Sequence, residues 1–217
     1  MIEAVIWDFG GVFTTSPFEA FNRYETQRGL PLDFIRTVNS TNPDTNAWAL
    51  FERSEINSAA FDVMFAKEAE ALGQTVRGAD VLPLLSGDVR PAVVKALMLC
   101  KAQFKVGCIT NNVSAGEGAG MASTAEKALT VAGIMTQFDA VIESSKAGVR
   151  KPDPRIYQMM CAQLDVAPSA CVYLDDLGVN CKPAAALGMK AIKVSNEGQL
   201  LRDLSAIVGL TFEGAAA

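Results

Sequence analysis

The sequence predicts an α/β protein with a doubly wound parallel sheet and an all-helical module inserted after the first strand. Short apolar runs rich in β-branched residues alternate with stretches of helical periodicity, which is the pattern of βαβ units. The first two apolar runs lie about a hundred residues apart, far more than one crossover needs. With 217 residues, half of them hydrophobic, the chain is long enough for one such domain and a small insertion.

The strands are predicted from apolar runs bounded by turn residues. The first run ends in Asp8, and the pair Gly10 and Gly11 then indicates a tight turn. The five predicted strands cover residues 3–9, 105–110, 140–143, 171–174 and 191–194. Helices between and after the later strands are expected at residues 121–132, 154–164, 179–187 and 197–208. Strands that alternate with helices of this length favour a parallel sheet.

The long first interval indicates a second unit. Helical periodicity recurs at residues 18–28, 48–51 and 59–72, and a helix over residues 90–103 is expected to return to the sheet. We therefore predict a core domain of residues 1–15 and 88–217, and an inserted helical domain of residues 16–87. The small side chains of residues 114–120 predict a mobile loop.

Charge and hydropathy argue against two classes of partner. The net charge is −5 and no dense Lys/Arg run occurs, so neither nucleic acid nor an anionic membrane surface is an expected partner. No run approaches the roughly 20 apolar residues of a membrane-spanning helix. The N-terminal sequence MIEAVIWDF is strand-like rather than signal-like, which predicts a cytoplasmic protein.

The residues that are missing narrow the chemistry. The chain contains no histidine, which excludes Ser-His-Asp and Cys-His catalysis and His-ligated zinc. Its five cysteines lack C-x-x-C spacing and indicate neither a zinc site nor a disulfide framework. Any chemistry must therefore use carboxylates, lysines, hydroxyls, amides and metal ions.

Side chains that could take part in catalysis stand at or after the ends of successive predicted strands. In a doubly wound sheet such groups gather at the carboxyl ends of the strands. The first strand ends in Asp8, the second in Thr110 and the fourth in the pair Asp175 and Asp176, while Lys151 follows the third. Each alone fits a turn or a helix cap. Together they supply the complementary charges that phosphoryl transfer needs.

At these residues the sequence resembles the haloacid dehalogenase superfamily. VIWDFGGV resembles its motif I, with Asp8 as nucleophile, and CITNN resembles motif II, with Thr110. RKPDPRIY resembles motif III, with Lys151, and VYLDDLGVN resembles motif IV. The resemblance covers the whole chain and implies a Rossmann-like core with a helical C1 cap at residues 16–87. It is strongest with the branch that contains the phosphatase domain of soluble epoxide hydrolase and a bacterial glucose-1-phosphatase.

The resemblance implies a Mg²⁺-dependent phosphatase of a small phosphorylated metabolite, acting through an aspartyl-phosphate on Asp8. It places catalytic roles on Asp8, Thr110 and Lys151. The metal is expected on Asp8, Asp176 and the backbone near Gly10, with Asn180 as a weaker ligand or outer group; Asp175 either tunes this site or caps the next helix. The residues expected to bind phosphate or substrate are Gly10, Gly11, Asn111, Asn112, Trp48 and Arg53. A homodimer is a further expectation, because members of this fold often dimerise.

Gly10 departs from the family pattern. Most phosphatases of the superfamily carry a second aspartate at this position, as general acid and base. Its loss typically costs about 10²- to 10⁴-fold in rate. We therefore expect slow turnover or a leaving group that needs little protonation, such as that of an anomeric sugar phosphate or an acyl phosphate. Thr14, Thr15 and Glu52 are candidates to replace the missing acid.

Two other functions fit parts of the same pattern. A non-catalytic phosphate-binding or regulatory protein would keep the metal site and lack the acid at Gly10. A haloacid dehalogenase also uses an aspartate nucleophile without that acid. The pair Asp175 and Asp176 speaks against dehalogenation, because a halide leaving group needs no metal and clustered acids would repel the departing anion.

Overall fold

A computed structural model describes residues 1–113 and 124–212 of the chain. The loop predicted at residues 114–120 lies outside the described residues. Five parallel strands form one sheet in the order β3-β2-β1-β4-β5. The strands are β1 (Ala4–Trp7), β2 (Lys105–Thr110), β3 (Ala140–Glu143), β4 (Cys171–Asp175) and β5 (Lys190–Lys193). The predicted doubly wound α/β fold is confirmed.

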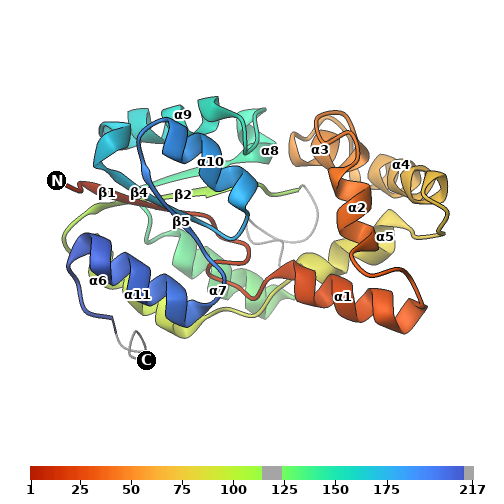
Figure 1. The fold of residues 1–217 in the computed structure, drawn as a ribbon, viewed down its shortest axis with the longest axis horizontal. Coiled ribbons are helices and arrows are strands. Elements are labelled where there is room, and N and C mark those ends of the chain that lie inside the picture. Colours follow the sequence, from red (N-terminus) through yellow and green to blue (C-terminus); the bar gives the residue numbers. More distant parts are fainter. Residues whose placement is uncertain (114–123, 213–217) are drawn as a thin grey trace.

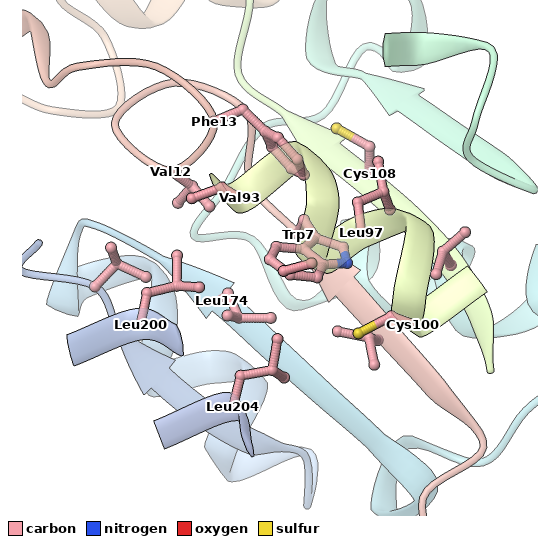
Figure 2. Packing of buried hydrophobic residues seen from close by; sticks show 14 of the residues in the cluster. Trp7, Val12, Phe13, Val93, Leu97, Cys100, Cys108, Leu174, Leu200 and Leu204 are labelled. Atoms are coloured by element: carbon pink, nitrogen blue, oxygen red, sulfur yellow. The ribbon is translucent and has the colours of Figure 1, made fainter. Parts of the chain in front are cut away.

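Helices cover both faces of the sheet (Figure 1). One face carries α6 (Pro91–Lys101), α7 (Ala125–Met135) and α11 (Glu197–Val208), and the other carries α9 (Pro154–Leu164) and α10 (Gly178–Ala186). Side chains of β1 alternate between the two cores: Val5 and Trp7 face the first, and Ala4 and Ile6 the second. Figure 2 shows Trp7 packed among residues of α6, α11 and β4. The central strand is thus buried on both sides, as a parallel sheet requires.

The interval after β1 folds into helices that pack around a core of their own. We call these elements the helical module: α1 (Pro17–Arg28), α2 (Phe34–Ser40), α3 (Ala47–Glu52), α4 (Ser58–Ala71), α5 (Gly78–Val81) and the 3₁₀ turn η1 (Leu82–Leu85). Their separate apolar cluster includes the stacked rings of Phe51 and Phe61, with centroids 4.8 Å apart. The module lies beyond the carboxyl ends of the strands (Figure 1). It is therefore placed over the edge of the sheet where the predicted active residues sit.

Two linkers join the module to the sheet and run side by side. Thr14 and Val89 form an antiparallel bridge, and the Thr15 amide donates to the Asp88 carbonyl at 2.9 Å. The Arg90 guanidinium donates to the carbonyl of Gly11 at 2.9 Å. This side chain ties the returning linker to the loop after β1.

The structure adds short elements that the sequence patterns did not predict. These are α2, α5, the turn η1, α8 (Ser144–Ala147) and η2 (Pro168–Ala170). All are seven residues or fewer, too short to show a helical period. Each helix within residues 1–113 and 124–212 is too short or too polar to cross a bilayer.

Candidate active site

The predicted reactive groups converge at the carboxyl edge of the sheet. Asp8 follows β1 directly, and its amide donates to the Leu174 carbonyl of β4 at 2.8 Å. Thr110 ends β2 and Asp175 ends β4, the two strands that flank β1. All three polar side chains are buried, with exposures of 7% for Asp8, 2% for Thr110 and 0% for Asp175. Parallel pairing thus brings together residues far apart in the sequence.

Lys151 lies between the two carboxylates and is buried with them. Its Nζ is 2.7 Å from Asp8 Oδ1 and 2.8 Å from Asp175 Oδ2, and it donates to the Ile109 carbonyl at 3.0 Å. Burial disfavours the ammonium, but Asp175 and Asp8 outweigh it and raise the pKa of Lys151 above its ordinary value. Lys151 is therefore a fixed positive charge beside Asp8.

The pKa values of Asp8 and Asp176 are also raised, which for a carboxyl group disfavours the charged form. Burial raises the pKa of Asp8 above its ordinary value, and Lys151 opposes that shift. Burial and the nearby Asp175 raise the pKa of Asp176 to about 6. Two carboxyl groups that are buried close together do not readily ionise at the same time unless a cation lies beside them. The charge pattern thus favours binding of a divalent cation.

The same acids provide oxygen ligands for such a cation. Ligand atoms of Asp8, Asp175 and Asp176 all lie within 4.8 Å of one another. Oxygen donors in a compact, anionic cluster suit Mg²⁺, which binds through one or two carboxylates and retains water. The residues present therefore fit a magnesium ion.

Asp175 differs from the other two acids because the protein already occupies its oxygens. Its Oδ1 accepts from the Leu177 amide at 2.8 Å and from Asn180 Nδ2 at 3.0 Å. Its Oδ2 accepts from Lys151 and from the hydroxyl of Tyr173. These contacts favour a role in holding Lys151 and in starting α10. The amide nitrogen of Asn180 is likewise turned toward Asp175.

Sequence reasoning missed Tyr173, although strand alternation places it on the same face as Asp175. Replacing Tyr173 with phenylalanine is expected to lower the free energy of unfolding by about 1.5–3 kcal/mol, because its hydroxyl donates to a buried charged group. Tyr157→Phe is the matched control, since that hydroxyl donates to the neutral Asn180 carbonyl at 2.7 Å. It is expected to cost about 1 kcal/mol. Urea unfolding measures both, and equal losses would contradict a stronger hydrogen bond from Tyr173 to Asp175 than from Tyr157 to the Asn180 carbonyl.

Gly11 is required by the close approach of Asp176. Its φ is +72°, and a Cβ at this position would lie 2.1 Å from Asp176 Oδ2. Gly10 differs, because a Cβ there would meet nothing within 4 Å. The turn after β1 is therefore closed to side chains at Gly11 and open to them at Gly10.

This contrast gives a second prediction. Gly11→Ala is expected to lower the free energy of unfolding by about 2–4 kcal/mol, because strain at positive φ adds to the displacement of Asp176. Gly29→Ala is the control: φ is +66° and a Cβ would meet nothing within 4 Å. Strain alone is expected to lower the free energy of unfolding of Gly29→Ala by about 1 kcal/mol. Urea unfolding with and without Mg²⁺ measures both variants; stabilisation by the ion should persist only in Gly29→Ala. Retained stabilisation in Gly11→Ala would contradict a role for Asp176 in cation binding.

The two asparagines after Thr110 use their side chains within the protein. Asn111 accepts from the Lys151 amide at 2.9 Å and donates to the Lys151 carbonyl at 3.0 Å. Asn112 donates to Glu143 at 2.7 Å and accepts from the Ser145 hydroxyl at 2.8 Å. Both residues lie at the site, but these contacts join the segment after β2 to Lys151, to the end of β3 and to α8. Direct phosphate binding by these two side chains would require breaking them.

Trp48 and Arg53 lie in the helical module. Trp48 packs edge-on against Phe61, with ring centroids 5.6 Å apart. Arg53 forms an ion pair with Glu55 at 2.6 Å and donates to the Asp44 carbonyl at 3.3 Å. These contacts favour packing and surface roles over substrate contact.

The candidates to replace the acid missing at Gly10 are also engaged. Thr14 Oγ1 accepts from the Gly11 amide at 3.3 Å, and Thr15 Oγ1 accepts from the Asp88 amide at 3.0 Å. Glu52 is buried and ion-paired, with an oxygen 2.7 Å from Arg150 Nε. The structure therefore favours anchoring roles for these three residues.

Comparison with known proteins supports the resemblance. A family model for haloacid dehalogenase-like hydrolases matches residues 2–188. Phosphatase MT3486 of Mycobacterium tuberculosis is 32% identical, over 99% of this chain and 98% of that protein. Acyl-CoA dehydrogenase family member 10 of Mus musculus is 31% identical over 95% of the chain, and mouse bifunctional epoxide hydrolase 2 is 28% identical over 99%. The chain spans only 19% and 40% of these two longer proteins.

Solved structures share the fold. A predicted hydrolase of this kind from Porphyromonas gingivalis aligns with a TM-score of 0.62 at 16% identity, over 97% of this chain and all of that one. An enzyme from Bacteroides thetaiotaomicron, solved with magnesium and inorganic phosphate, aligns with a TM-score of 0.59 at 17% identity. That alignment covers 91% of this chain and 97% of the other. At these identities the likeness shows the common fold.

Proposed function

The chain belongs to the haloacid dehalogenase-like hydrolase family, and we propose that it is a magnesium-dependent phosphatase of a small phosphorylated metabolite. The observation that carries the proposal is the position of Lys151, whose Nζ lies 2.7 Å from Asp8 and 2.8 Å from Asp175. A buried lysine beside a buried carboxylate, with a second acid at the same edge, matches the charge distribution of phosphoryl transfer. Similarity to phosphatase MT3486 over nearly the full length of both proteins supports this reaction class.

In the proposed mechanism Asp8 attacks phosphorus, the bond from phosphorus to the leaving-group oxygen breaks, and the leaving group departs as an anion, which gives an aspartyl-phosphate. Water then attacks the aspartyl-phosphate, which releases inorganic phosphate and regenerates Asp8. Asp8, Asp176 and the backbone carbonyl of Gly10 would hold Mg²⁺. When bound, Mg²⁺ relieves the repulsion between a carboxylate and a phosphate dianion. Lys151 keeps its charge beside the equatorial oxygens throughout, and Thr110 donates a hydrogen bond to them. Asp175 holds Lys151 in place.

The helical module is proposed to act as the cap of this site, with the core domain at residues 1–15 and 88–217 and the cap at residues 16–87. Its elements lie over the carboxyl edge of the sheet and join it through the two paired linkers (Figure 1). A lid in this position would exclude water from Asp8. The substrate would enter between the module and the sheet.

Gly10 favours a leaving group that departs without protonation. None of the three residues considered as substitutes is free of other contacts. Anomeric sugar phosphates and acyl phosphates meet this requirement. We propose such a phosphate ester or anhydride as the substrate class.

A screen of phosphorylated metabolites with Mg²⁺ tests the proposal. We expect phosphate release that is lost with a chelator, with anomeric and acyl phosphates ahead of alkyl phosphates. Binding of phosphate or beryllofluoride without turnover on any substrate would instead support the regulatory function that Gly10 also allows. Chloride release from 2-chloro acids in the presence of chelator would identify a dehalogenase.

A further inference from the structure

The cap helix α3 ends at the core in a residue that contacts two neighbours of Lys151. Glu52, the last residue of α3, is 6% exposed. Its backbone carbonyl accepts from the Ser144 hydroxyl of α8 at 2.7 Å. Its carboxylate lies 2.7 Å from Arg150 Nε and 3.5 Å from Asn111 Nδ2. One module residue therefore contacts three core residues at the edge of the active site.

Two of these contacts lead directly to Lys151. Arg150 precedes Lys151 in the chain. Asn111 binds both backbone groups of Lys151, accepting from its amide at 2.9 Å and donating to its carbonyl at 3.0 Å. Glu52 thus contacts Asn111, which binds both backbone groups of Lys151, and Arg150, which precedes Lys151 in the chain.

An ion pair joins the Glu52 carboxylate to the Arg150 guanidinium. Burial raises the pKa of Glu52 and Arg150 opposes the shift, so the carboxylate needs the guanidinium to remain charged where it lies. The Arg150 guanidinium also donates from Nη1 to the Pro43 carbonyl of the module at 3.0 Å. If Glu52 moved away from this position, the partly buried guanidinium of Arg150 would lose its contact with the Glu52 carboxylate.

We propose that Glu52 is a positioning residue that couples docking of the helical module to alignment of Lys151, through Asn111 and Arg150. The module then completes the active site as well as covering it. The inference rests on the proposed function for its kinetic consequence only. Its structural consequence, order at the Lys151 backbone, can be measured in a protein without turnover.

Hydrogen exchange at the Lys151 amide is the direct test, with NMR detection on the full chain. In Glu52→Gln we expect protection of this amide to fall at least about tenfold relative to the amides of β4. Glu68→Gln is the matched control: Glu68 of the module binds the Ala47 amide at the opposite end of α3, at 2.8 Å. It should leave the Lys151 amide unchanged relative to β4. If protection is unchanged in Glu52→Gln, or falls equally in Glu68→Gln, the proposal is wrong.

Kinetics on p-nitrophenyl phosphate with Mg²⁺ provides the second readout. In Glu52→Gln we expect kcat to fall about tenfold, with KM within about twofold of the wild-type value. Adding Asn111→Ala should lower kcat no further than the worse single variant, because both act on Lys151. If the losses in kcat from the two single variants multiply in the double variant, Glu52 does not act on Lys151 through Asn111.

A wild-type protein without turnover contradicts the proposed function, while the exchange test still decides the role of Glu52. If Glu52→Gln does not fold, Glu52→Asp, which keeps the charge with a shorter reach, takes its place.

Discussion

Replacing Asp8 with asparagine is expected to lower kcat for magnesium-dependent phosphate release by at least about 10⁴-fold. The amide cannot attack phosphorus, so no aspartyl-phosphate forms. The change also removes an anionic ligand from the acidic cluster and the partner 2.7 Å from Lys151 Nζ. Nucleophile, cation binding and charge pairing are therefore lost together.

The variant should remain folded, because asparagine has nearly the same size and the buried Asp8 carboxylate is itself disfavoured by desolvation. Asp165→Asn is the control, since Asp165 is an exposed cap residue in a left-handed conformation that asparagine accepts. Its kcat should match that of the wild type. Mass spectrometry after rapid quenching should detect a phosphoryl adduct on wild-type protein alone. Full activity in Asp8→Asn would remove Asp8 as nucleophile.

The fold and the meeting of Asp8, Thr110 and Asp175 could be predicted because they depend on local patterns. Apolar runs locate buried strands, and parallel strands carry their carboxyl ends to one edge. The predicted bounds of β2 and β3 agree with the structure, and β1 and β4 agree to within two residues at each end. Helix alternation then leaves few topologies open.

The fine organisation of the site could not be predicted in this way. Asn111 and Asp175 were expected near phosphate and metal, respectively, as their polarity suggests. In the structure Asn111 binds the backbone of Lys151, 40 residues away, and Asp175 is enclosed by four donors. Such contacts depend on where loops meet, and no period in the sequence encodes that. Glu52 shows the same limit, because its partners come from two other parts of the chain.

Restoring the missing acid should have the second large effect. Gly10→Asp is expected to raise kcat/KM for alkyl phosphates by about 10²-fold, because protonation of a poor leaving group is worth about 10² to 10⁴. The position can accept the side chain: a Cβ on Gly10 would meet nothing within 4 Å, and the residue lies outside the left-handed region. Aspartate there would follow Asp8 by two positions in the turn after β1. The gain should be small for acyl phosphates, which leave without protonation.

Gly10→Asn separates proton transfer from simple occupation of the space. It has the same size and cannot donate a proton as a carboxylic acid does, so alkyl phosphates should gain nothing from it. The ratio of alkyl to acyl phosphate rates is the quantity to measure, because it cancels differences in folding and cation affinity. An unchanged ratio in Gly10→Asp would show that leaving-group protonation does not limit the enzyme. A ratio that rises only in Gly10→Asp would mean that glycine at this position restricts turnover to substrates with good leaving groups.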